Sequence, residues 1–77
     1  MKITQNDIGK SFLVGPDRFN LLFRARLIKI NENGNLVLTC SNGHNTVAFD
    51  ETRLYQEIEP GAPVWWRLVD GKLERAA

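Results

Sequence analysis

The sequence contains only one cysteine, Cys40, among its 77 residues. A single cysteine excludes an intrachain disulfide and a metal site built from several cysteines. Small extracellular domains usually carry disulfides, so we expect this protein to work in a reducing, cytoplasmic setting. The absence of an Asn-x-Ser/Thr glycosylation sequon agrees with that location.

Long apolar runs and an excess of charge are also missing. No stretch approaches the roughly 20 apolar residues needed to span a bilayer, and residues 1–7 contain no apolar signal-peptide core. The formal net charge is +1, which provides no overall field toward nucleic acid or a membrane surface. We therefore expect no membrane partner, and one small domain spanning residues 1–77 with a thin hydrophobic core.

Three tight-turn dipeptides are present: Asn33-Gly34, Asn42-Gly43 and Asp70-Gly71. The favoured two-residue hairpin turn needs positive φ at both central residues, which glycine adopts freely and Asn or Asp tolerates. Each dipeptide lies between short apolar stretches, so the sequence predicts antiparallel hairpins. The expected strands cover residues 8–14, 21–30, 36–41, 45–49, 64–69 and 72–75.

Two further patterns predict short helical turns. Residues 4–7 have the form of a capping box, so a helical turn is expected at the start of the chain. Asp50 can cap a short helix running to about residue 57, in which Leu54 and Ile58 are spaced i, i+4. The same segment also alternates as a strand would, and we favour the helical turn.

Two-residue turns determine which residues face one another. The turn at Asn33-Gly34 sets Ile30 opposite Val37, and the turn at Asn42-Gly43 sets Leu38 opposite Val47. Both registers place the same residues on one predicted core face, with Lys29 as its main exception. This face collects Phe23, Ala25, Leu27, Leu36, Leu38, Cys40, Val47 and Phe49.

The opposite face is polar at one end, with Arg24 and Arg26, and apolar at the other. In a small barrel the long second strand bends, and a bulge near residues 27–28 would turn its two ends into different packing layers. Alternatively, the apolar end is an exposed patch that binds a partner. We favour the bulge. The apolar residues in question are Ile28, Ile30, Val37 and Ala48.

The last hairpin gives a clear pattern of faces. A two-residue turn at Asp70-Gly71 sets Leu68 opposite Leu73 and Arg67 opposite Glu74. Alternation along the preceding strand then points Val64, Trp66 and Leu68 inward, and Trp65, Arg67 and Val69 outward.

The residues that could support catalysis do not converge. Cys40 and His44 are the one nucleophile–base pair close in sequence, but the predicted register places them on opposite faces. Residues 9–11 lack the upstream glycine and the strand–loop–helix context of a phosphate-binding loop. One histidine and one cysteine are also poor material for a metal site. We therefore predict that the protein is not an enzyme and holds no cofactor or metal.

The predicted fold class is mainly β: an antiparallel sheet curled into a small five- or six-stranded barrel, with one short helical turn. The order of strand, long loop, three-strand meander, turn and terminal hairpin resembles SH3-like barrels in layout. This resemblance concerns layout alone and carries no function with it.

Outward-facing tryptophan and arginine are residue types enriched at protein-binding hot spots. The leading hypothesis is a non-catalytic protein-interaction or regulatory module, whose partner is another protein or a second copy of the chain. The partner-binding candidates are Trp65, Arg67, Arg24, Arg26, Ile28, Ile30, Val37 and Tyr55.

The alternative hypothesis is a small barrel that binds single-stranded nucleic acid, because such barrels combine exposed aromatic rings with neighbouring cations. Ten Lys and Arg residues are nearly matched by nine Asp and Glu residues, which argues against a groove that follows phosphates. The residues available for this role are Arg24, Arg26, Trp65 and Arg67, to which Arg18, Phe19 and Arg53 can be added.

Overall fold

Seven antiparallel strands form one sheet in the computed structural model, which describes residues 2–40 and 46–76, with the backbone alone for residues 46–48. Two short 3-10 turns accompany the strands: η1 (Gln5–Asp7) and η2 (Glu51–Arg53). The strands are β1 (Ser11–Val14), β2 (Leu21–Ile30), β3 (Leu36–Cys40), β4 (Thr46–Phe49), β5 (Leu54–Ile58), β6 (Trp65–Val69) and β7 (Lys72–Arg75).

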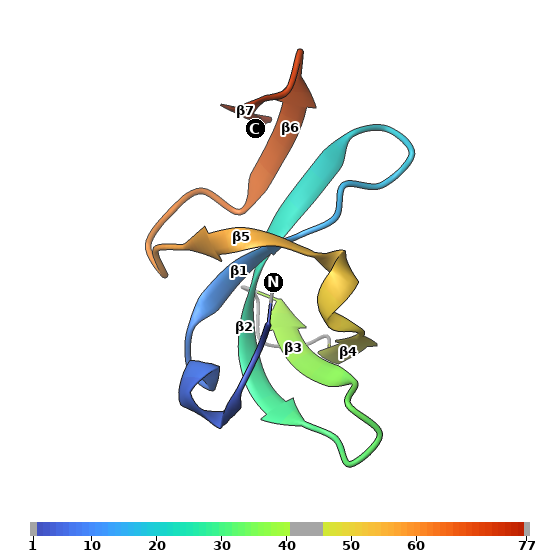
Figure 1. The fold of residues 1–77 in the computed structure, drawn as a ribbon. Helices are drawn as coiled ribbons and strands as arrows, with labels where there is room; N and C mark the ends of the chain where they lie inside the picture. Colours follow the sequence, from blue (N-terminus) through green and yellow to red (C-terminus); the bar gives the residue numbers. More distant parts are fainter. Residues whose placement is uncertain (1, 41–45, 77) are drawn as a thin grey trace.

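The sheet curls into a half-barrel around the long strand β2 (Figure 1). The main order is β4-β3-β2-β1-β5, while β6 pairs with the first residues of β2 and β7 pairs with β6. The predicted fold class, mainly β with a strongly curled antiparallel sheet, is confirmed. All six expected strands are present, and β5 is an additional one.

Strand β5 replaces most of the helical turn predicted for residues 51–57, so that part of the prediction is wrong. The Asp50 carboxylate does cap a turn, because it accepts a hydrogen bond from the backbone N–H of Thr52. The turn ends at Arg53, and β5 then pairs with β1. A bulge at Tyr55 brings Leu54 opposite Val14, where Leu54 is buried. Pairing with the edge of β1 decides between two local patterns that the sequence alone leaves balanced.

The β2–β3 hairpin has a longer loop than predicted. The N–H of Asn31 donates to the carbonyl of Asn35 at 2.8 Å, and the N–H of Gly34 donates to Asn31 at 2.9 Å. Gly34 alone has positive φ, at 89°, while the Asn33 side chain accepts a hydrogen bond from Asn35 N–H. The loop therefore holds three residues, as in hairpins closed by a glycine bulge. The register next to it pairs Ile30 with Leu36, one residue away from the prediction.

A bulge at Ile28 compensates for this shift and confirms the bulge expected near residues 27–28. Beyond it, Leu27 pairs with Leu38. The two one-residue shifts add up to two, and side chains alternate with a period of two, so the predicted core face is preserved. The bulge also explains the exception at Lys29, which is exposed because the bulge turns it out and brings Ile30 against the core.

The main core lies on the inner face of the half-barrel. Four of the predicted core residues, Ala25, Leu27, Leu36 and Leu38, are buried, and Cys40 is half-buried. The turn at Asn42-Gly43 lies outside the described residues, but the β3–β4 register beyond it is as predicted. The core cluster is Phe12, Val14, Ala25, Leu27, Leu36, Leu38 and Leu54, with Ile3, Phe23, Ile30 and Phe49 partly buried against it.

A second packing layer covers part of the opposite face. Leu13 and Leu22 are fully buried although neither belongs to the main core cluster. Trp66 stands opposite Leu22, and its indole N–H donates to the carbonyl of Pro63 at 2.7 Å. The face that the sequence left open between solvent, a partner and a further layer is therefore, at this end, a further layer.

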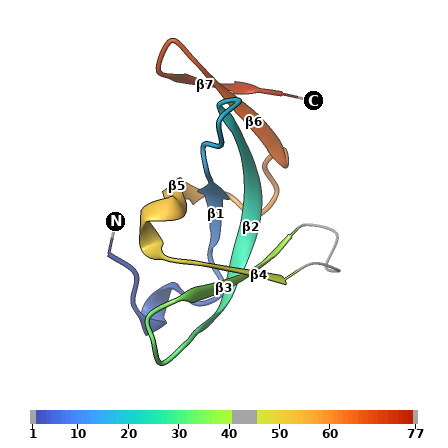
Figure 2. The ribbon, with the colours of Figure 1, turned by 90° about the vertical axis from the view of Figure 1, so that its right-hand side faces the viewer.

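The terminal hairpin β6–β7 has the predicted turn. Asp70 and Gly71 both have positive φ, at 51° and 77°, and the register pairs Leu68 with Leu73 and Arg67 with Glu74. In Figure 2 this hairpin extends from the rest of the sheet beside the start of β2. Within the part of the chain that the structure describes, no helix is long and apolar enough to cross a bilayer.

Candidate functional site

Three aromatic rings form a row that begins at the core and ends on β6. Trp65 stands opposite Phe23 across the β6–β2 pairing, with ring centres 6.0 Å apart. Phe49 lies 6.4 Å from Phe23, and both neighbours are tilted by about 55° to the Phe23 ring. Such tilted contacts are favourable aromatic geometry. Trp65 is nevertheless 48% exposed, so it presents an ordered ring to solvent.

An arginine stands at each end of this row. The guanidinium of Arg53 lies 5.6 Å from the centre of the Phe49 ring, within cation–π range. Arg67 follows Trp65 by two residues on the same face of β6 and is exposed. Glu74 is opposite Arg67, yet among the described residues neither Arg67 nor Arg53 forms an ion pair through its guanidinium.

A shallow hollow adjoins Trp65. It has a volume of about 320 Å³ and is lined by Leu21, Trp65, Arg67 and Ala76. The N–H of Ala76 donates to the carbonyl of Trp65 at 3.0 Å, which holds the end of the chain along β6. We use the name Trp65 surface for Leu21, Phe23, Phe49, Arg53, Trp65, Arg67 and Ala76.

The exposure pattern of β6 is the one predicted from alternation. Trp65, Arg67 and Val69 are exposed, whereas Trp66 and Leu68 are half-buried. Trp65 is therefore exposed as predicted, although it lies on the same face of the sheet as Phe23, which packs against the core.

Arg24 and Arg26 do not share this surface. They alternate along β2 with Phe23 and therefore project from its other face. Arg24 is half-buried, and its guanidinium donates a hydrogen bond to the carbonyl of Pro60. Arg26 is exposed opposite Ser11. The sequence analysis grouped both arginines with Trp65 because all three were expected to face outward. The structure places the arginines and Trp65 on two different surfaces.

The other candidates do not gather either. The bulge separates Ile28, which is exposed, from Ile30, which packs against the core. Val37 is half-buried opposite Lys29. Tyr55 is exposed at the bulge of β5. Ile28, Ile30 and Val37 therefore do not form the single exposed apolar patch that was considered from the sequence.

Sequence reasoning placed Phe23 and Phe49 in the core and missed their contribution to this surface. The reason is that β2 and β6 pair without a connecting turn, so the sequence does not predict which of their residues lie opposite one another. Arg53 was a further candidate together with Arg18 and Phe19. The Arg18 guanidinium instead covers the exposed Phe19 ring at 4.9 Å on the β1–β2 loop, outside the row.

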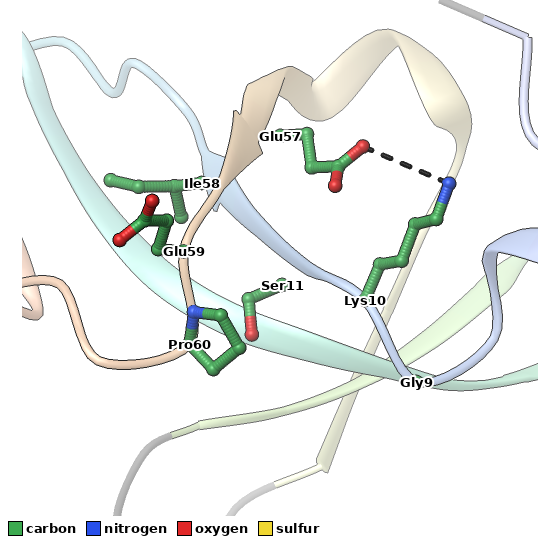
Figure 3. Close-up of a pocket in the computed structure, with 7 residues that line it drawn as sticks. All are labelled: Gly9, Lys10, Ser11, Glu57, Ile58, Glu59 and Pro60. Atoms are coloured by element: carbon green, nitrogen blue, oxygen red, sulfur yellow. Dashed lines mark ion pairs between the residues drawn. The ribbon is translucent and has the colours of Figure 1, made fainter.

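A larger hollow of about 550 Å³ lies between the start of β1 and the end of β5 (Figure 3). Its charges compensate one another, because the Lys10 ammonium lies 3.0 Å from Asp7 Oδ1 and 3.8 Å from Glu57 Oε1. Lys10, the cation among the residues that line this hollow, is thus already paired with carboxylates. The hollow is lined by Gly9, Lys10, Ser11, Glu57, Ile58, Glu59 and Pro60.

These contacts shift two pKa values. The backbone N–H of Thr4, and then the Lys10 ammonium, lower the pKa of Asp7. Asp7, followed by Glu57, raises the pKa of Lys10. Because folding lowers the pKa of Asp7, its stabilising contribution is complete above the ordinary value of 3.8 and is lost as pH falls through the folded value. Through these ion pairs Lys10, the residue before β1, contacts Asp7 of η1 and Glu57 of β5.

The structure describes only one member of the Cys40–His44 pair considered as nucleophile and base. Cys40 is half-buried on β3, and His44 lies outside the described residues. No three His, Cys, Asp or Glu side chains converge as metal ligands within 2–40 and 46–76. Comparison of the chain with protein-family models, curated proteins and solved structures found no match.

Proposed function

We propose that this protein is a non-catalytic interaction module that binds a protein partner through the Trp65 surface. The observation that carries the proposal is Trp65, half exposed yet packed against Phe23 and bordered by a hollow. Tryptophan and arginine dominate binding hot spots. A ring that is already ordered loses little side-chain freedom when a partner covers it. We place this role in the cytoplasm, on the cysteine usage described above.

Replacing Trp65 with alanine is expected to weaken binding of the partner at least tenfold, since anchor residues of this type contribute about 2 kcal/mol or more. The measurement is quantitative capture of proteins on immobilised protein from an extract of the source organism. Ile28→Ala is the matched control, because Ile28 is a comparably exposed apolar residue away from the Trp65 surface. Its capture should equal that of the unsubstituted protein.

Equal capture by Trp65→Ala and the unsubstituted protein would refute the proposal, and loss with Ile28→Ala alone would move the site to the bulge of β2. A second copy of the chain is one form of protein partner. Sedimentation tests for such self-association. A species heavier than the 8.8 kDa monomer that becomes monomeric in Trp65→Ala would be an oligomer formed through this surface.

Single-stranded nucleic acid is the second candidate ligand. The row of rings with an arginine at each end favours it, because bases stack on exposed rings while cations contact the phosphates. Separation of Arg24 and Arg26 from Trp65 removes two of the cations on which this hypothesis relied. We therefore rank it below a protein partner.

A further inference from the structure

We propose that the segment bound on the Trp65 surface is an extended peptide with alternating apolar side chains and an acidic residue toward each end. This inference rests on the proposed function and specifies the chemistry of the partner. Two independent features of the surface, its spacing and its charge, support it.

The spacing of the rings matches an extended chain. The ring centres lie 6.0 and 6.4 Å apart along the row from Trp65 through Phe23 to Phe49. An extended peptide advances about 3.3 Å per residue, so side chains on one of its faces are about 6.6 Å apart. The spacing of alternate side chains in such a peptide is therefore similar to the distance between neighbouring rings.

The charge at the two ends of the row determines what flanks the apolar side chains. Arg67 and Arg53 are exposed, and within the described residues no carboxylate pairs with either guanidinium. The nearby Asp50 and Glu51 carboxylates accept hydrogen bonds from backbone N–H groups of Thr52 and Ile3. Acidic side chains at both ends of the peptide would complement the two arginines, while the rings between them call for apolar groups.

The hollow beside Trp65 gives the peptide an anchoring contact. Its lining combines the apolar Leu21, Trp65 and Ala76 with the cation of Arg67. An apolar side chain seated there has the guanidinium beside it, so the acidic residue follows close to that anchor. A nucleic-acid strand carries charge at every step, whereas the two arginines of the Trp65 surface, Arg53 and Arg67, lie beside Phe49 and Trp65 at the ends of the row.

The experiment uses the full chain and three probes followed by NMR, in which the two indole N–H signals report on Trp65 and Trp66 separately. The first probe is the acetylated, amidated peptide Glu-Ser-Leu-Ser-Leu-Ser-Leu-Ser-Glu. The second is the same peptide with lysine at both ends, and the third is a ten-residue oligothymidylate. The acidic peptide should shift the Trp65 signal and leave the Trp66 signal in place.

The lysine-ended peptide should bind about tenfold more weakly, because two exposed ion pairs are exchanged for repulsion. Arg67→Gln and Arg53→Gln should each weaken the acidic peptide by about two- to fivefold and strengthen binding of the lysine-ended peptide, because each removes part of the repulsion. Equal affinity for both peptides, or no shift with either, would overturn the inference. A response to oligothymidylate alone would assign the surface to nucleic acid.

Failure of this inference is distinguishable from failure of the proposed function. If partner capture depends on Trp65 but is insensitive to Arg67→Gln and Arg53→Gln, the proposed function stands and the acidic chemistry is wrong. If capture is insensitive to Trp65→Ala as well, both are wrong.

Discussion

Gly15→Ala is expected to lower the free energy of unfolding by about 3 kcal/mol or more. Gly15 has φ of +129°, a conformation that side-chain-bearing residues rarely adopt, and an added Cβ would lie 2.8 Å from the carbonyl oxygen of Leu21. That oxygen belongs to backbone and accepts the N–H of Asp17 at 3.0 Å, so it cannot move without loosening the β1–β2 connection. The substitution therefore adds backbone strain and a clash together.

Thermal unfolding measures this effect. In a domain of this size each kcal/mol shifts the midpoint by about 4–8 °C, so a fall of at least about 12 °C is expected. Two glycines provide graded controls. Gly34→Ala introduces positive-φ strain at +89° into open space and should cost about 1 kcal/mol. Gly61→Ala has neither strain nor a close neighbour and should be near neutral.

If Gly15→Ala proved no more destabilising than Gly34→Ala, the close approach between the Gly15 backbone and Leu21 would not exist in solution. A graded order of Gly15, Gly34 and Gly61 is the result that the geometry requires.

Leu38→Ala is expected to cost about 3–4 kcal/mol, the range for emptying a buried leucine site. Leu38 is fully buried in the middle of β3, opposite Leu27. A chain of 77 residues has only about 4–12 kcal/mol of total stability, so this loss removes a large share of it. Urea denaturation should show a much lower midpoint.

Val69→Ala is the matched control, since Val69 is 40% exposed near the end of the terminal hairpin. We expect a change of about 0.5 kcal/mol or less there. Similar losses for Leu38→Ala and Val69→Ala would mean that the inner face of the half-barrel is not the core.

Local turn chemistry predicted one hairpin completely and another only in part. Asp70 and Gly71 both take positive φ, so the predicted register of β6 and β7 is correct. Asn33-Gly34 has the same chemistry, but the Asn33 side chain bonds to the backbone of Asn35, and the loop lengthens by one residue. A dipeptide identifies a turn without specifying the length of its loop.

The bulge at Ile28 could be anticipated because the face opposite the predicted core is polar at one end and apolar at the other. Strand β5 was only the less favoured alternative to a helical turn, because its pairing with β1 joins segments about forty residues apart. Local periodicity gives no information about such long-range contacts.

The candidate site likewise has features that the sequence predicts locally and others that depend on long-range pairing. Alternation within β6 predicted that Trp65 and Arg67 face outward, which is a local property. The position of Phe23 opposite Trp65 depends on the pairing of β2 with β6, which no turn determines. For the same reason the sequence joined Arg24 and Arg26 to Trp65, although β2 projects them from its other face.

Photocross-linking from the Trp65 surface can show whether a protein partner binds there. A benzophenone-bearing amino acid in place of Glu74, opposite Arg67, would report on this surface, and the same group in place of Glu57 on β5 is the control. We expect a protein adduct from position 74 that Trp65→Ala removes, and none from position 57. Adducts of equal yield from both positions, or an adduct at position 74 that persists in Trp65→Ala, would contradict it.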